Sequence, residues 1–266
     1  MGKGEIRKSR LPALTAKTEK RRLDVLLVER GLADSRQRAQ ALILAGRVRI
    51  SGAAQVKAGA LVALDAPLEI AGGECAYASR GGEKLAGALE DFGVEPSGLV
   101  CLDVGCSTGG FTDCLLQRGA VRVYAVDVTT SQLAWKLRRD PRVVPIEKNA
   151  RFLLPGDVPE AARIVTADLS FIGLAKVLPA LVPLAAPGAH FLLLVKPQYE
   201  LERGAVGRGG VVRDPALHRR AIVRVRAAAE SGGLCVLGDR PSRLPGAEGN
   251  LEFFLHCQKP ERKMDE

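Results

Sequence analysis

The chain has 266 residues, of which 47% are hydrophobic, and its formal net charge is +9. This length leaves room for one large and one small domain with a sizeable buried core, so we expect a soluble globular protein. Six cysteines occur without a Cys-x-x-Cys pair, and only three histidines accompany them. This pattern argues against a zinc-ligand set and a disulfide framework, and we predict no metal site.

The positive charge is concentrated at the front of the chain. Residues 1–22 carry eight Lys or Arg and two Glu, which favours a polyanionic partner, although a merely solubilising tail would have the same composition. No apolar signal segment opens the chain, so we expect a cytoplasmic protein. The long apolar stretch Leu174–Val195 contains three prolines, a lysine and a histidine. It predicts a helix, a Pro-Gly turn and a buried strand rather than a membrane span.

Two short helices follow a flexible basic tail, which we place at residues 1–20. Gly31 is suited to end the first helix and Gly46 the second, while Asp34 or Ser35 can cap the start of the second. The inward positions are Leu23, Leu26 and Leu27 in the first helix and Ala39, Leu42 and Ile43 in the second.

The next segment, Arg47–Ser51, alternates apolar and basic residues as a strand does. Arg47 and Arg49 therefore share one face, beside the helical Arg36 and Arg38, and form a phosphate-binding surface. The motifs Arg22-Leu-Asp, Ser35-Arg-x-x-Ala39 and Gly46-x-Val48-x-Ile50-x-Gly52 resemble the S4-like RNA-binding domain. A basic helix-turn-helix with a solvated charged face is the alternative. The residues that we predict to bind RNA are Arg22, Arg36, Arg38, Arg47, Arg49, Lys57 and Arg80.

Ala71-Gly72-Gly73 is typical of a linker between domains. Ser79-Arg-Gly-Gly-Glu-Lys-Leu85 then leads into a helix that ends at Gly93. Its inward positions are Leu85, Leu89 and Phe92. Lys84 lies at the edge of that apolar face, where a lysine taken alone is an ordinary surface residue.

The centre of the chain is an apolar strand at residues 99–104 that runs into a glycine-rich turn and a new helical pattern. In a doubly wound α/β fold, ligands bind at such a carboxyl strand end. The spacing Asp103-x-Gly105-x-x-x-Gly109-Gly110 fits neither a dinucleotide-binding loop nor a P-loop. It resembles the first motif of S-adenosylmethionine-dependent methyltransferases.

The following strand, Val121–Asp127, ends in a carboxylate that can accept both hydroxyls of an unphosphorylated ribose. Any doubly wound domain with a tight turn is the alternative explanation of the glycine loop. We predict a helix around Gln132–Arg138 and a strand at Val143–Ile146. After these, Asn149 is placed either to meet an adenine edge or to cap a loop.

Two more charged groups follow buried strands. Asp168 ends the strand Arg163–Asp168, and Lys196 directly follows the apolar run at residues 191–195. Since its neighbours are buried, this lysine would be partly desolvated. The Gly- and Arg-rich residues 200–213 predict a loop that either closes over RNA or is simply solvated. A helix at 215–231 and a hairpin of 234–237 with 251–255 complete the chain, with Glu252 inside the second strand.

In chain order, Lys84, Asp168, Lys196 and Glu252 resemble the Lys-Asp-Lys-Glu tetrad of FtsJ-class ribose 2′-O-methyltransferases. Residues 21–258 as a whole are similar to the TlyA family, some of whose members carry the name hemolysin. Cys75-Ala-Tyr-Ala78 departs from the family by lacking an Arg and a Trp at the domain junction. The motifs that carry the resemblance are Ser79-Arg-Gly-Gly-x-Lys84, Asp103-Val-Gly-Cys-Ser-Thr-Gly-Gly-Phe111, Ala167-Asp-Leu-Ser-Phe171, Val195-Lys-Pro-Gln198 and Gly249-Asn-Leu-Glu-Phe253.

This resemblance implies a class I, Rossmann-like methyltransferase domain at 81–260, an S4-like domain at 21–72, a linker at 73–80 and a tail at 261–266. It implies S-adenosylmethionine as the cofactor and a monomer that methylates ribosomal RNA cytidines near the subunit interface. The implied cofactor-binding residues are Asp103, Gly105, Ser107, Thr108, Gly109, Gly110, Phe111, Asp127, Asn149 and Asp168.

Within the tetrad, the resemblance places Asp168 near the amino end of the cofactor and Lys84 near the reacting ribose. Lys196 acts either as the base or only as a group that orients the hydroxyl, and Glu252 orients a lysine. Two other functions stay open: a membrane-active cytolysin, suggested by Leu174–Val195, and a non-catalytic RNA-binding assembly factor.

Overall fold

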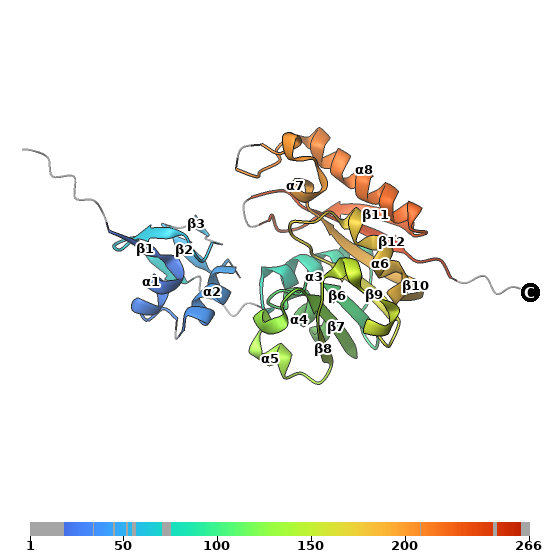
Figure 1. Ribbon diagram of the computed structural model, residues 1–266, viewed down its shortest axis with the longest axis horizontal. Helices are drawn as coiled ribbons and strands as arrows, with labels where there is room; N and C mark the ends of the chain where they lie inside the picture. Colours follow the sequence, from blue (N-terminus) through green and yellow to red (C-terminus); the bar gives the residue numbers. More distant parts are fainter. Residues whose placement is uncertain are drawn as a thin grey trace, which may run out of the picture.

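The computed structural model describes residues 19–33, 35–44, 46–51, 53–54, 57–70, 76–207, 209–246 and 249–261. A small N-terminal domain lies beside a larger α/β domain (Figure 1). The predictions for the Ala71–Gly73 linker and for Asp34, Cys75 and Arg208 lie outside the described residues, as do most of the two terminal tails.

Within its described residues, the small domain has two helices and five short strands. Its elements are β1 (Lys20–Arg22), α1 (Leu23–Glu29), α2 (Arg36–Leu44), β2 (Val48–Ile50), β3 (Ala53–Ala54), β4 (Leu61–Ala63) and β5 (Leu68–Ile70). All six predicted inward residues of the two helices are buried in one core. The Ser35 hydroxyl accepts a hydrogen bond from the amide of Arg38 at 3.1 Å, which confirms Ser35 as a cap. The strands β1, β3, β4 and β5 were not predicted, because none of them has the apolar and basic alternation seen at residues 47–51.

Asp24 connects the elements of this domain. The fully buried carboxylate accepts hydrogen bonds from Arg22 at 3.0 and 3.1 Å, from Arg36 at 3.1 Å and from Gln40 at 2.9 Å. The hydrogen bonds from Arg22 are the main reason that the pKa of Asp24 lies well below its usual range. Arg22 and Arg36 thus have a structural role, and since about half of each side chain stays exposed, both can still meet a phosphate.

Replacing Asp24 with alanine is expected to destabilise the small domain by about 2 kcal/mol, because the change removes charged hydrogen bonds that join α1 to α2. Because the pKa of Asp24 is lower in the folded state than in the unfolded chain, its ionised carboxylate stabilises the fold fully at pH values above the unfolded pKa of about 3.9. This stabilisation is lost as the pH falls below that value. Amide hydrogen exchange in α1 and α2 measures the change. Asp65→Ala, an exposed site in the same domain, is the control, and equal exchange in both variants would contradict the prediction.

The larger domain is built on a seven-stranded sheet with the order β11-β12-β10-β9-β6-β7-β8. Only β12 runs antiparallel to its neighbours, so the fold is the mostly parallel, doubly wound sheet that the sequence predicts. Its strands are β6 (Val100–Val104), β7 (Arg122–Asp127), β8 (Val143–Glu147), β9 (Ala162–Ala167), β10 (Ala185–Val195), β11 (Cys235–Pro241) and β12 (Phe253–Gln258).

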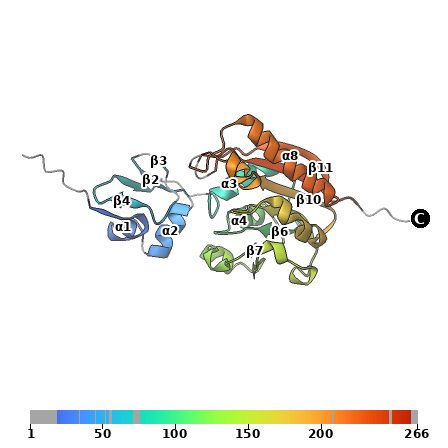
Figure 2. The ribbon, with the colours of Figure 1, turned by 45° about the horizontal axis from the view of Figure 1, so that its top comes forward.

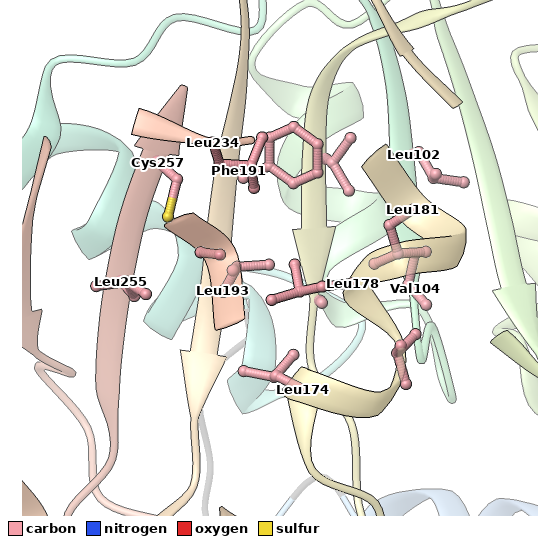
Figure 3. Close-up of a cluster of buried hydrophobic side chains, with 14 of the residues drawn as sticks. Leu102, Val104, Leu174, Leu178, Leu181, Phe191, Leu193, Leu234, Leu255 and Cys257 are labelled. Carbon is pink, nitrogen blue, oxygen red and sulfur yellow. The ribbon is translucent and has the colours of Figure 1, made fainter. Parts of the chain in front are cut away.

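Helices cover both faces of the sheet (Figure 2). The first face packs against α3 (Arg80–Phe92), α4 (Gly110–Gln117) and residues next to α5 (Trp135–Arg138). The other face packs against α6 (Leu178–Leu181) and α8 (Pro215–Ser231), and α7 (Pro197–Glu200) follows β10. Figure 3 shows part of this second core, where Leu102 and Phe191 of the sheet meet Leu178 and Leu181 of α6.

Three local predictions were wrong. The segment predicted as one helix at 132–138 is a 3-10 turn, Thr130–Gln132, followed by the short α5, because Leu133 and Ala134 are extended. Pro187-Gly188 lies inside β10 as an irregularity rather than before it. Glu252 immediately precedes β12 instead of lying within it. Among the described residues, no helix is long and apolar enough to cross a membrane.

Candidate functional site

A cavity of about 680 Å³ opens at the carboxyl edge of the sheet. The strand order reverses between β6 and β9, so the loops that leave these strands diverge to opposite faces and form a crevice. Lys84, Asp168, Lys196 and Glu252 all line this cavity, together with the glycine-rich loop after β6. The structure therefore brings together the four charged groups that the sequence singled out from separate elements.

Two glycines allow the glycine loop to pass close to neighbouring segments of the chain. Gly105 and Gly109 have φ angles of +86° and +91°, a region that side chains disfavour. A Cβ on Gly105 would overlap the carbonyl oxygen of Asp168, and one on Gly109 would overlap Leu137. The amide of Ser107 donates to the carboxylate of Asp127 at 2.9 Å, so the loop is tied to the end of β7.

The predicted cofactor residues divide into those on the cavity wall and those behind it. Ser107, Thr108, Gly110 and Phe111 are on the wall with Gly105 and Asp168. Half-buried Asp127 supports the loop through Ser107.

Asp103 is completely buried behind the loop, where it accepts hydrogen bonds from Thr112 at 2.6 Å and Thr166 at 3.1 Å. Burial raises the pKa of Asp103 to about 7. The Asn149 side chain accepts a hydrogen bond from the amide of Arg151 at 3.0 Å. Of its two predicted roles, this contact corresponds to capping a loop. Neither Asp103 nor Asn149 lines the cavity.

The tetrad forms two ion pairs. Lys84 Nζ lies 2.6 Å from Glu252 Oε2, and both side chains are buried. Lys196 pairs with Asp168 in the same way and also lies 3.4 Å from the hydroxyl of Ser170. Glu252 therefore orients Lys84, while Asp168 is the partner of Lys196.

The protonation of Lys196 follows from its surroundings. Burial lowers the pKa of Lys196, but the carboxylates of Asp168 and Glu252 raise it by more, so that the net pKa lies above that of an ordinary lysine. Lys196 is consequently an ammonium group at neutral pH. Of the two roles that the sequence left open, this charge state favours holding the hydroxyl over removing its proton.

A buried set of hydrogen bonds around Asn250 could not be predicted from the sequence. The Asn250 side chain accepts from the amide of Val212 at 2.9 Å and donates to the carbonyl of Gly210 at 3.0 Å. His218 Nε2 bonds the carbonyl of Val212 at 2.9 Å. Together they fix the end of the Gly-rich loop next to Glu252. A single Asn in a turn gives no periodic signal by which to find such a role.

Besides Phe111, two further aromatic side chains line the cavity. Phe171 and Tyr199 line it with ring centroids 5.5 Å apart. Phe171 is 90% exposed and has φ +68°, a strained conformation for a side chain other than glycine. An aromatic ring held in solvent at a cavity mouth offers a flat face to a planar ligand.

Two predicted RNA-binding residues reach the cavity. Lys57 of the small domain and Arg80 of α3 both line it, and the Arg80 side chain packs directly against Gly46. Arg38 and Arg49 are exposed on the small domain, and Arg47 is half-buried. The cation surface of the small domain thus continues to the cavity at Lys57.

Comparison with known proteins places this geometry in a family. The FtsJ-like methyltransferase family matches residues 77–259, and the S4 domain family matches residues 21–54. A relative from Mycobacterium tuberculosis, the 16S/23S rRNA (cytidine-2'-O)-methyltransferase TlyA, is 51% identical over 236 residues, or 88% of each chain. This chain belongs to the TlyA family of FtsJ-like methyltransferases.

Other TlyA-like relatives carry a different name. Hemolysin A of Brachyspira hyodysenteriae is 37% identical, over 88% of this chain and 98% of that protein. A solved structure from Streptococcus thermophilus that is also labelled a hemolysin has a TM-score of 0.71 and 38% identity, covering 93% of this chain and 92% of that one.

As a member of this family, the chain uses S-adenosylmethionine, and the residues present fit that cofactor. The cavity beside the glycine loop has room for a ligand, and its wall carries the hydroxyls of Ser107 and Thr108, which can hydrogen-bond polar groups. Half-buried Asp127 at the end of β7 keeps acceptor capacity for ribose hydroxyls. Among the described residues, no cluster of side chains could hold a metal ion.

Gly105→Ala is expected to weaken cofactor binding at least about tenfold, because the new methyl group would strain a φ of +86° and press on the Asp168 carbonyl. Isothermal titration with S-adenosylmethionine measures this loss. Gly98→Ala is the control, since Gly98 also has a positive φ but has open space around its Cβ position. Equal affinities for the two variants would contradict the prediction.

Proposed function

We propose that this chain transfers a methyl group from S-adenosylmethionine to the ribose 2′-hydroxyl of cytidines in ribosomal RNA. The proposal rests on one observation. Two ion pairs, Lys84–Glu252 and Lys196–Asp168, lie on the wall of one cavity beside the glycine loop. The name of the M. tuberculosis relative supports RNA cytidines as the substrate. The proposal extends to an S4-like domain at 21–72, a methyltransferase domain at 81–260 and a cytoplasmic monomer.

When bound, S-adenosylmethionine supplies an electrophilic methyl group on a sulfonium. A ribose hydroxyl is a weak nucleophile, so the protein must orient it and take its proton as the new bond forms. The charged Lys196 donates a hydrogen bond to the 2′-oxygen and holds it in line, while the Asp168 carboxylate beside it accepts the proton. Lys84, fixed by Glu252, supplies a second positive charge near the reacting oxygen.

The base and the phosphates of the RNA are bound by residues that take no part in the methyl transfer. The exposed ring of Phe171 is suited to stack on the target base once that base leaves its helix. The arginines of the small domain contact phosphates, which gives affinity and register without reading the sequence.

Ribose-methylation mapping tests this function directly. Purified ribosomal subunits from cells that lack the enzyme are incubated with cofactor and either the wild-type chain or Lys196→Met, and both ribosomal RNAs are mapped. A new 2′-O-methylcytidine with the wild type alone is the expected result. No new mark on either RNA, with normal cofactor binding, would refute the proposed function.

Arg38→Gln combined with Arg49→Gln is expected to flatten the salt dependence of RNA binding. Each phosphate contact that is lost should reduce the log-log slope by roughly 0.7 to 0.9. Filter binding of ribosomal RNA over a range of salt concentrations measures the slope. Arg163→Gln on the larger domain serves as the control for lost positive charge. If the double variant keeps the wild-type slope, the small domain does not bind phosphates with these residues.

A further inference from the structure

An exposed aromatic and basic surface lies next to the cofactor loop, and the function proposed above does not use it. We name it the α5 surface and define it by Trp135, Arg138 and Arg139. Trp135 is 64% exposed, although it is the only tryptophan of the chain. The guanidinium carbons of Arg138 and Arg139 lie 5.6 and 5.1 Å from the centre of its ring.

The exposure of Trp135 is not a by-product of packing. Leu133 and Leu137 are the buried anchors of this segment, and they lie close to Gly109 of the glycine loop. The amide of Ala134 also donates to the carbonyl of Thr108, a residue of the cavity wall, at 3.1 Å. Since these contacts hold the segment in place, Trp135 is exposed at the start of a fixed short helix, α5, which lies beside α4 (Figure 1).

Some of the basic side chains near Trp135 are paired with carboxylates, and others are not. Lys136 pairs with Asp113 at 2.7 Å, and Arg142 pairs with Asp140 at 2.8 Å. Within the described ranges, no carboxylate pairs with Arg138 or Arg139. The α5 surface therefore combines a flat aromatic face with two cations that have no acidic partner in that part of the chain.

From this geometry we infer that the α5 surface binds RNA outside the reaction cavity, with an unpaired nucleobase stacked on Trp135 and the flanking phosphates on Arg138 and Arg139. Stacking of a base on an aromatic ring stabilises complexes with single-stranded nucleic acids and tolerates any base, and arginine contributes cation–π contacts. The surplus of positive charge favours RNA over an apolar protein partner. The inference rests on the proposed function, because it assumes an RNA substrate.

The single tryptophan makes the test direct. Trp135 fluorescence is followed while the full chain is titrated with an oligocytidine single strand, and fluorescence anisotropy of the labelled strand reports binding independently. We expect saturable quenching with the same midpoint as the anisotropy, and weaker quenching by a fully paired RNA duplex. RNA binding without quenching would overturn the inference. So would quenching by S-adenosylmethionine alone, which would assign Trp135 to the cofactor.

Methylation of ribosomal subunits gives the second readout. Trp135→Ala is expected to lower kcat/KM for the RNA about tenfold, as loss of one stacked base does, while cofactor affinity stays unchanged and Trp135→Phe retains most activity. The matched control is Phe152→Ala, which removes another aromatic ring, 62% exposed and with the Arg151 guanidinium 5.7 Å away. Equal kcat/KM for Trp135→Ala and Phe152→Ala would overturn the inference.

A failure of the inference can be told apart from a failure of the proposed function. Lys196→Met is expected to lose methyl transfer yet keep the quenching of Trp135, since this lysine lies in the cavity and not on the α5 surface. If the wild-type chain methylates no ribosomal RNA at all, the proposed function falls. If it methylates RNA and Trp135→Ala does so equally well, only the α5 inference falls.

Discussion

Replacing Lys196 with methionine is expected to lower the rate of methyl transfer about a thousandfold, while cofactor affinity changes little. Methionine keeps the length of the apolar stem and removes the ammonium group that pairs with Asp168. Without that group the ribose oxygen is no longer held in line, and the carboxylate loses its partner. Single-turnover transfer from radiolabelled S-adenosylmethionine measures the rate. A loss of less than tenfold would show that Lys196 is not part of the reacting site.

The pH dependence of the wild type distinguishes the two roles of Lys196. The pKa of Lys196 lies above the usual lysine value of about 10.4, so the group stays charged as the pH rises from about 7 to 9. A positioning role that needs the charge therefore predicts a nearly flat rate over this range. A base role needs the neutral amine and predicts a rate that rises about tenfold per pH unit. A rising profile for the chemical step would contradict the positioning role.

The sequence predicted the position of those site residues that directly follow a strand. The carboxyl ends of parallel strands share one edge of a sheet, so Asp168 and Lys196 could be placed together from their strands alone, and the structure confirms this. Which lysine pairs with which carboxylate could not be predicted. Lys84 and Glu252 are 168 residues apart, and their contact depends on how the antiparallel β12 packs beside β10.

The burial of polar side chains was the main feature that could not be predicted from the sequence. A pattern of apolar positions assigns polar side chains to the surface, so Asp24 gave no sign that it would be fully buried among Arg22, Arg36 and Gln40. Asp103 was assigned to the cofactor from the resemblance of its motif, and in the structure this fully buried carboxylate accepts hydrogen bonds from Thr112 and Thr166. Hydrogen-bond partners from other elements decide such cases, and they become visible only in three dimensions.

Replacing Lys84 with methionine is expected to abolish activity and also to destabilise the larger domain by about 3 to 5 kcal/mol. The Glu252 carboxylate is buried, and Lys84 is its ion-pair partner at 2.6 Å. Removal of the lysine leaves a negative charge in the interior without its counter-ion. Thermal and urea unfolding of the full chain, read on the larger domain, measure the loss.

The double variant Lys84→Met with Glu252→Met separates stability from catalysis. A buried ion pair contributes little net stability compared with apolar groups of similar size, because its attraction roughly offsets the desolvation of both charges. We therefore expect the double variant to recover most of the stability that Lys84→Met loses, yet to remain inactive. If the double variant is as unstable as Lys84→Met, the instability comes from packing around Lys84. If it regains activity, the Lys84–Glu252 pair serves the fold and not the reaction.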